Sequence, residues 1–407
     1  MAGHASRTLK LNSINAIILL AFFPMIAIGA IYEKNVIVIG VFSVLALVSY
    51  FKFNRVRNNV KANSRVRAWM LYVAFAVITT LLHGRYDDIK GIAADISFLF
   101  IALGLSSQVR LDAFFAIYPK FMTFVGLLAI IFAVLPVNPF ELMKAGSSYS
   151  AVDSFSGGGL SAFFEYRHYY AMLLVVAIWI HLYTAKERKM AYYVTTIILV
   201  LSVVLTYTRS AYVAFLFSGG IYILKSKKER IKKRTFLFIT LIMILLLLGM
   251  ALFYDSIVSN IFGRFSEVSR ILTSGGGVRG YTLLEGTRHT LNEGILSILT
   301  GDGVGAAIKW LRQNPYGTWG EWNYAIDVQY VSTFMNTGLI GLVLVLRPTI
   351  IEWKQYFKDT NKYNNAISMS IISIAAGICF FDIYEMSISL FALWNILVSL
   401  PMDTVEN

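Results

Sequence analysis

Arg209 lies in a short polar turn between two long apolar runs, in the sequence LTYTRSAYVAF. Charged residues at or within a membrane boundary are rare and are functional candidates by default. An arginine guanidinium binds phosphate oxygens through two parallel hydrogen bonds and needs no metal ion to do so. Arg209 is therefore a candidate for phosphate binding. The alternative is a turn residue whose side chain reaches the lipid headgroups.

Two further arginines lie in the long segment that follows. Arg279 comes shortly after a run of three glycines, and Arg288 lies farther along, beside Glu285 and His289. Around Arg279, a phosphate-binding role and a plain solvated position fit the pattern equally well. For Arg288 alone, a surface ion pair with a nearby acid is favoured, and phosphate binding is the alternative.

Two acids stand beside apolar runs, namely Glu165 in FFEYRHYYAM and Asp327 in NYAIDVQYVSTF. A carboxylate held at the end of a membrane span can accept the proton of a substrate hydroxyl, or it can pair with an arginine and orient it. We predict that Glu165 or Asp327 is the catalytic base. Further candidates for the same site are Arg167, His168, His289 and Tyr330.

Aromatic residues are dense between residues 310 and 324, where Trp319 and Trp322 are found. They form either an interfacial belt or a set of rings that stack on sugars. The histidines and acids show no spacing typical of metal ligands, so we expect no metal and no cofactor. The GDGVG sequence at residues 301–305 lacks the α/β unit that a nucleotide-binding loop requires. We expect a helix end and a turn there.

The composition indicates the elements that position these residues. The chain has 407 residues, of which 57% are apolar and 14% charged, whereas soluble domains carry about 25% charged residues. Its net charge of +13 indicates basic cytoplasmic loops rather than nucleic-acid binding. We predict an all-α, polytopic integral membrane protein with about twelve spans. The predicted spans are 13–32, 36–52, 68–83, 91–106, 120–136, 168–184, 190–208, 210–225, 235–254, 327–346, 366–384 and 386–401.

The basic residues gather in short segments on one predicted side of the membrane, such as 52–67 and 225–234. Basic residues near span ends are retained in the cytoplasm, so we expect both termini to be cytoplasmic. Two longer segments, 137–167 and 255–326, then lie outside, and loops of this length are usually functional. We treat residues 1–407 as one membrane domain in which these two segments are periplasmic loops.

The larger loop is predicted to be partly helical. Between residues 281 and 299, Leu284, Arg288, Leu291 and Ile295 recur at spacings of three and four. This spacing predicts one amphipathic helix, and the glycines that follow it predict its end.

The sequence resembles the O-antigen polymerase and ligase superfamily of bacterial membrane glycosyltransferases, and within it the polymerases more closely. The matching pieces are FFEYRHYYAM, the TRSAYVAF turn, VRGYTLLEGTRHTLNEGILSILTGDGVGA and DVQYVSTFMNTGLIGLVLVL, and their order covers nearly the whole chain. Similar ligases place a histidine at the start of the span after the large loop, where this chain has Asp327. That departure favours a polymerase.

The resemblance implies a GT-C-like fold in the bacterial inner membrane and a metal-independent, inverting transfer at the periplasmic face. Undecaprenyl-pyrophosphate-linked glycans are then both donor and acceptor, the product is O-antigen or capsular polysaccharide, and Arg209, Arg279 and Arg288 bind pyrophosphate. The implied partners are these glycans, membrane lipids and a chain-length regulator protein, and no nucleic acid. The alternatives are a ligase that transfers glycan to lipid A-core and a flippase or transporter, although transporters usually have two similar halves.

Overall fold

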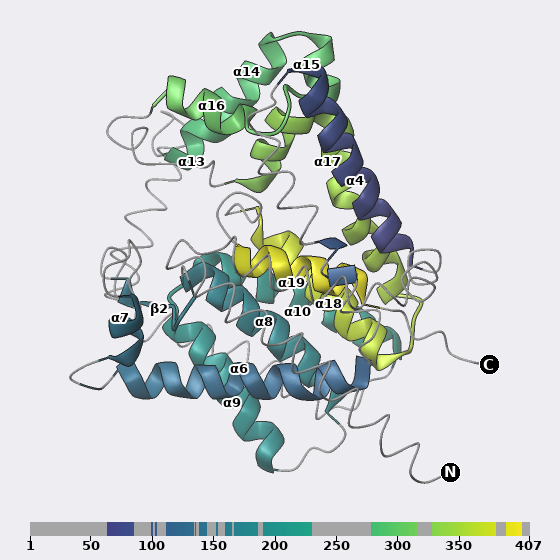
Figure 1. The fold of residues 1–407 in the computed structure, drawn as a ribbon. Coiled ribbons are helices and arrows are strands. Elements are labelled where there is room, and N and C mark those ends of the chain that lie inside the picture. The colour runs from purple at the N-terminus through teal and green to yellow at the C-terminus, as the bar shows by residue number, and fades with distance from the viewer. Residues whose placement is uncertain are drawn as a thin grey trace.

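The computed structural model describes residues 63–84, 99–100, 102–103, 111–133, 135, 138–144, 152–153, 159–164, 167–185, 190–229, 278–315, 328–379 and 388–400. The regular elements in this part of the chain are helices and two short strands, β1 (Val152–Asp153) and β2 (Gly159–Leu160), which pair antiparallel. The all-α class is therefore confirmed for the described residues (Figure 1).

The helices follow one another along the chain in three groups. The first group is α4 (Ser64–Leu82), α6 (Leu111–Ala133), α7 (Pro139–Lys144), α8 (Arg167–Thr184), α9 (Met190–Leu205) and α10 (Arg209–Glu229). The second group belongs to the predicted large loop: α13 (Val278–Tyr281), the π-helix η3 (Thr282–Gly286), α14 (Thr287–Asn292), α15 (Ile295–Thr300) and α16 (Ala306–Gln313). The last group is α17 (Gln329–Tyr356), α18 (Lys362–Gly377) and α19 (Ile388–Ser399).

Three helices of the described part are long and apolar enough to cross a membrane: α4, the Ala113–Ala133 part of α6, and α17. Helices α9 and α10 carry shorter apolar stretches. Eight predicted spans overlap described helices, namely 68–83, 120–136, 168–184, 190–208, 210–225, 327–346, 366–384 and 386–401. The predicted spans 13–32, 36–52 and 235–254 lie outside the described residues, as does most of 91–106. The count of about twelve spans and the GT-C-like arrangement therefore stay predictions.

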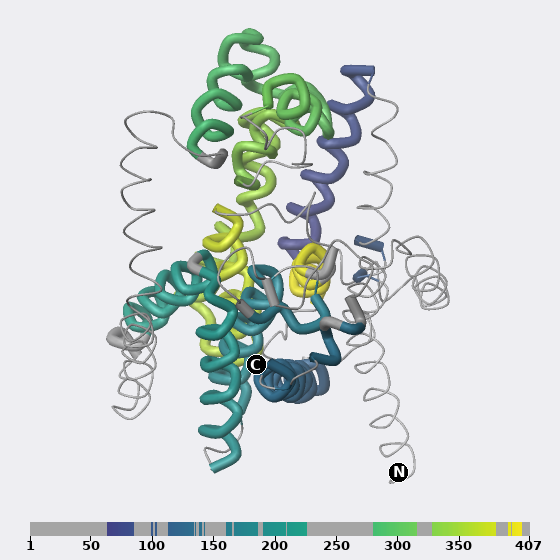
Figure 2. Tube along the Cα trace, turned by 90° about the vertical axis from the view of Figure 1, so that its left-hand side faces the viewer, coloured from purple at the N-terminus to yellow at the C-terminus, as the bar shows by residue number. Residues whose placement is uncertain are grey.

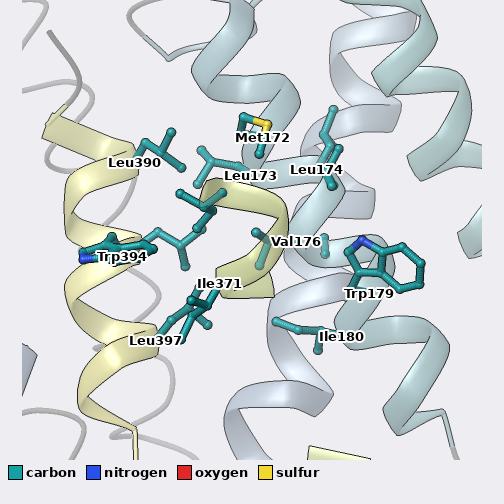
Figure 3. Close-up of a cluster of buried hydrophobic side chains, with 14 of the residues drawn as sticks. Met172, Leu173, Leu174, Val176, Trp179, Ile180, Ile371, Leu390, Trp394 and Leu397 are labelled. Atoms are coloured by element: carbon teal, nitrogen blue, oxygen red, sulfur yellow. The ribbon is translucent and has the colours of Figure 1, made fainter. Parts of the chain in front are cut away.

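Helix α8 is the centre of the main core. Every residue from Tyr169 to Ile180 is buried, as expected for a helix that is apolar on all sides. Helices α6, α9, α10, α18 and α19 surround it, and α6 runs across the direction of α4 (Figures 1 and 2). In Figure 3, Trp394 and Leu397 of α19 and Ile371 of α18 lie on one side of α8, and Trp179 points to the other side. Trp179 donates a hydrogen bond to Ser218 of α10 at 3.0 Å.

Helices α4 and α17 pack side by side and run in opposite directions (Figure 1). At one end, the buried side chains of Arg65 and Glu352 form an ion pair of 3.3 Å. At the other end, the backbone N–H of Val304 donates to the Thr80 hydroxyl at 2.9 Å. The pair is thus fastened at both ends, once between its own side chains and once through the loop helices.

Other contacts also join particular helix ends. Tyr330, at the start of α17, donates its hydroxyl proton to the carbonyl of Ala375, near the end of α18, at 2.8 Å. Lys225, late in α10, donates to the carbonyl of Tyr356 at the end of α17 and to that of Asp359 at 2.6 Å. Helix ends that an alternating topology places on one side are therefore in contact, and which side is cytoplasmic stays a prediction.

Candidate functional site

The turn that carries Arg209 is tightly constrained. Tyr207 adopts a left-handed backbone conformation with φ of 50°, which is uncommon for a residue other than glycine. Thr206 donates its hydroxyl proton to the Val203 carbonyl at 2.7 Å, and Tyr212 donates to the Val204 carbonyl at 2.6 Å. Thr206 and Thr208 are buried, so this turn leaves its backbone little freedom.

Arg209 is the first residue of α10. A helix N-terminus carries partial positive charge and unpaired N–H groups, which favour anions. The constrained turn therefore fixes the backbone of Arg209 at the N-terminus of α10, where the first N–H groups of the helix favour an anion. The sequence predicted the residue and its turn, while the left-handed Tyr207 that closes the turn has no signal in the sequence.

Arg279 lies in α13, which continues through η3 into α14. The prediction of one helix over residues 281–299 is wrong in two respects. Its first part is a π-helix, and Gly294, with φ of 109°, separates α14 from α15. That backbone conformation is open to glycine and disfavoured for other residues, so the chain turns there instead of continuing the helix. Single π-turns within α-helices are frequent at functional sites.

The predicted apolar face of these helices does not form a core. Leu284, Leu291 and Ile295 are 51%, 51% and 72% exposed. The loop helices pack through other residues, because a second core joins Ala307, Trp310 and Leu311 to Val331 and Met335 in the first part of α17. Gly286 of η3 also lies against Met335 and Val331.

Trp310 is the centre of an aromatic group. Tyr281 stacks on it with ring centroids 5.8 Å apart, and His289 stacks with centroids 6.1 Å apart. Only 6% of Trp310 is exposed, so its role is packing rather than sugar stacking. The His289 ring also lies 3.6 Å from the Glu293 carboxylate. The pKa of Tyr281 is raised, first by burial and then by the negative charge of Glu285.

The GDGVG sequence forms the predicted helix end and turn. It also forms hydrogen bonds with helix α17, which the sequence did not indicate. Helix α17 is broken at Gly338, where φ is 63° and ψ is −165°. This break leaves carbonyl groups of the preceding turn without donors from their own helix. The N–H of Asp302 donates to the Met335 carbonyl and that of Gly303 to the Asn336 carbonyl, each at 3.0 Å.

We call this contact between residues 301–305 and 335–338 the glycine joint. Two of the N–H groups that a phosphate loop would present are already donated to protein carbonyls here. The Asn336 side chain also accepts the N–H of Ala307 at 2.9 Å. The GDGVG turn is therefore a structural connection between the loop helices and α17.

Comparison with known protein families identifies this region. Residues 194–346 match the family described as O-antigen ligase. This segment of the chain is therefore similar to the O-antigen ligase family. The resemblance to the O-antigen polymerase and ligase superfamily is thus confirmed. No curated protein matches the chain at a significant level.

The matched segment begins within α9 and ends within α17, so it contains the Arg209 turn, the loop helices and the glycine joint. Arg279, Arg288, His289, Trp319, Trp322, Asp327 and Tyr330 also lie within it. Glu165, Arg167 and His168 precede it.

The structure places several of the predicted site residues in packing or surface roles. Arg288 is 71% exposed and lies 3.3 Å from Glu285, which is the surface pair favoured from the sequence. The Tyr330 hydroxyl is used in the contact with Ala375. His168 meets Tyr169 edge to face, with ring centroids 4.1 Å apart.

Glu165, Asp327, Trp319 and Trp322 lie outside the described residues, and so do the side chains of Arg209 and Arg279. The chain on one side of each acid is described. Phe164 is fully buried, and Val328 precedes α17 and lies against the second core. Among the residues that the structure describes, no three His, Cys, Asp or Glu residues are grouped to hold a metal ion.

Proposed function

We propose that this protein is a membrane glycosyltransferase that polymerises undecaprenyl-pyrophosphate-linked oligosaccharide repeats at the periplasmic face. The observation that carries the proposal is the extent of the family match, because residues 194–346 contain all three candidate phosphate-binding arginines and one of the two candidate bases. The protein would lie in the bacterial inner membrane with both termini in the cytoplasm. It would act as one membrane domain, with residues 137–167 and 255–326 as periplasmic loops.

The donor side of the reaction needs fixed positive charge. When the bond between the anomeric carbon and the pyrophosphate breaks, negative charge develops on the leaving group, and donors already in place stabilise it. Arg209, at the N-terminus of α10, and Arg279, in α13, would supply that charge without a metal ion. Arg288 would act at most from the edge, since its side chain is largely exposed and paired.

The acceptor side needs a base. Glu165 or Asp327 would take the proton from the acceptor hydroxyl while its oxygen attacks the anomeric carbon from the face opposite the pyrophosphate, which inverts the configuration. The first part of α17, which begins just after Asp327, packs on the loop helices that follow Arg279. This packing supports a site in which Asp327, as the base, and Arg279, as a pyrophosphate ligand, are carried by one rigid unit. His168 and His289 are the alternative bases.

An O-antigen ligase is the second candidate, because the matched family bears that description. Its donor chemistry would be the same, and its acceptor would be lipid A-core instead of a second lipid-linked repeat. The presence of Asp327 where similar ligases have a histidine supports the polymerase.

The purified protein, reconstituted in liposomes, tests this proposal with one synthetic undecaprenyl-pyrophosphate-linked repeat unit, and a gel resolves the products. A ladder of longer chains is expected from the repeat alone. Transfer only after lipid A-core is added would support the ligase. Movement of the lipid-linked sugar across the bilayer without chain growth would overturn both enzymes in favour of a flippase.

The two arginines that would bind the pyrophosphate, Arg209 and Arg279, are tested in the same assay. Arg209→Lys and Arg279→Lys keep the charge and remove the planar fork, so each is expected to reduce polymer strongly. Lys309→Arg, an exposed basic substitution on α16, is the control and should leave the ladder unchanged. If the Arg209→Lys, Arg279→Lys double variant makes as much polymer as the wild type, pyrophosphate binding by these two arginines is not part of the mechanism.

A further inference from the structure

Helices α14 and α15 present a row of large apolar side chains that nothing in the described structure covers. Ile295 and Leu296 are 72% and 65% exposed, and Leu291 is 51% exposed. Leu283, Leu284 and Leu299 extend the row, with exposures of 47%, 51% and 41%. Isolated exposed leucines are common on proteins, whereas a contiguous apolar patch marks an interaction surface.

This patch continues into the exposed sides of two helices that are long and apolar enough to cross a membrane. The backbone of Leu299 lies against Gly338, and the exposed Leu339 and Ile340 of α17 follow at once. The contact of Val304 with Thr80 brings the loop beside the last residues of α4, where Leu82 is 76% exposed. The exposed apolar side chains of the two candidate spans and of the loop helices therefore adjoin one another, and the loop helices lie at one end of α4 and α17 in Figure 1.

The buried apolar residues of this region lie on other helices, α16 and α17. Trp310, Leu311, Val331 and Met335 form the second core there, so the exposed row is a separate surface. Arg288 stands within the row by its spacing and is 71% exposed. An arginine beside leucines on a short helix suits a membrane interface, where the stem lies among acyl chains and the guanidinium reaches lipid phosphate.

We propose that η3, α14 and α15 lie in the polar interface at the periplasmic surface of the bilayer, with Leu284, Leu291, Ile295 and Leu296 inserted among the lipid chains. The occupant of this surface is the phospholipid bilayer. The predicted periplasmic loop would then be held at the membrane surface, at the level where a lipid-linked substrate carries its pyrophosphate. This inference depends on the exposed surface and the neighbouring candidate spans, and it stands whether or not the protein transfers glycans.

Fluorescent labels on single cysteines test the proposal in the full chain. Cys379, the one native cysteine, is first replaced by serine. The label NBD is then attached at Leu291→Cys or Ile295→Cys, and at Glu293→Cys as the matched control, since the side chain of Glu293 is also 51% exposed. Each protein is reconstituted in vesicles of phosphatidylethanolamine and phosphatidylglycerol.

Labels at positions 291 and 295 are expected to emit at shorter wavelength than the label at 293. A lipid with a nitroxide near its glycerol should quench them more than aqueous iodide does, and the label at 293 should show the reverse order. Equal iodide quenching at all three positions would place the helices in water and overturn the proposal. Self-quenching that grows with the protein-to-lipid ratio would assign the surface to a second copy of the chain and would also overturn it. If one leucine or isoleucine variant does not fold, the other decides the outcome.

Discussion

The two ends of the α4–α17 pair are held by different chemistry. At one end, Arg65 and Glu352 meet as buried charged side chains, each 1% exposed. At the other end, Thr80 of α4 accepts the backbone N–H of Val304. The glycine joint holds that same turn to α17 through backbone groups, since the N–H groups of Asp302 and Gly303 satisfy carbonyls that the break at Gly338 sets free. The end at Arg65 and Glu352 therefore depends on two matching charged side chains. The end at the glycine joint depends on glycines, which carry no side chain.

The charged end is part of a larger buried polar group. Arg65 also donates to the Leu400 carbonyl at 2.8 Å, Asn63 donates to the Val398 carbonyl at 3.1 Å, and Ser368 donates to Glu352. These bonds tie α4, α17, α18 and the end of α19 together. A charge buried in this way is tolerated because its partners compensate the loss of hydration.

The largest effect is expected from breaking the charged end on one side only. Arg65→Met leaves Glu352 buried without its partner, which should cost about 3–5 kcal/mol of folding stability. The thermal unfolding midpoint of the purified protein in detergent measures it. The double variant Arg65→Met, Glu352→Met removes both charges and should recover much of the loss. A double variant less stable than the single one would show that the pair is not the dominant interaction there.

The glycine joint should respond to the smallest possible side chain. In Gly301→Ala the new Cβ would lie 2.4 Å from the carbonyl carbon of Asn336, at a φ of 67°. We expect a loss of about 2–4 kcal/mol from this clash and the strained backbone, seen as a lower unfolding midpoint. Gly338→Ala, with its Cβ 2.4 Å from the carbonyl carbon of Leu299, should behave alike.

A matched control exists for the joint in Gly220→Ala on α10, where a Cβ would meet nothing within 4 Å. Alanine is the better helix former by up to about 1 kcal/mol, so this variant should be as stable as the wild type or slightly more so. If Gly301→Ala and Gly220→Ala unfold at the same temperature, the backbone contact does not hold the loop to α17.

Lys225 tests the same end of α17 at which Glu352 lies, with a smaller expected loss of stability. Its buried ammonium group donates to two backbone carbonyls and to Asn365 at 2.9 Å. Lys225→Met keeps the length of the side chain and leaves these acceptors unpaired, so a loss of about 1.5–3 kcal/mol is expected. Urea unfolding followed by tryptophan fluorescence measures it. Unchanged stability would mean that water replaces the ammonium at no cost.

Single cysteines can show which end of the α4–α17 pair faces the periplasm and which faces the cytoplasm. These substitutions are expected to leave the stability of the protein unchanged. In a protein with Cys379→Ser, a cysteine at Ser274 is expected to react with an impermeant maleimide added to intact cells. A cysteine at Lys228 should react only after the membrane is opened. The reverse pattern would place the large loop in the cytoplasm and remove the proposed periplasmic site.

The sequence by itself determined the class of this protein and the positions of most described helices. Long apolar runs have few structural outcomes, because a backbone surrounded by lipid must satisfy its hydrogen bonds within a helix or a closed barrel. The superfamily was also visible, since the TRSAYVAF turn and the VRGYTLLEGTRHTL stretch lie within the segment that the family match covers. The helix end at GDGVG followed from the rarity of left-handed backbone in residues other than glycine.

The tertiary structure alone decided how these elements meet. Spacing showed that Leu284, Leu291 and Ile295 share a face, but periodicity does not say whether that face meets a core or is left exposed, and here it is exposed. A glycine within an apolar run, such as Gly338, reads as a tolerated helix residue until the chain that supplies its missing donors is seen. The partners of Arg65 and of the broken helix α17 come from distant parts of the chain. Local pattern carries no information about such pairs, because their stability arises only when the fold brings them together.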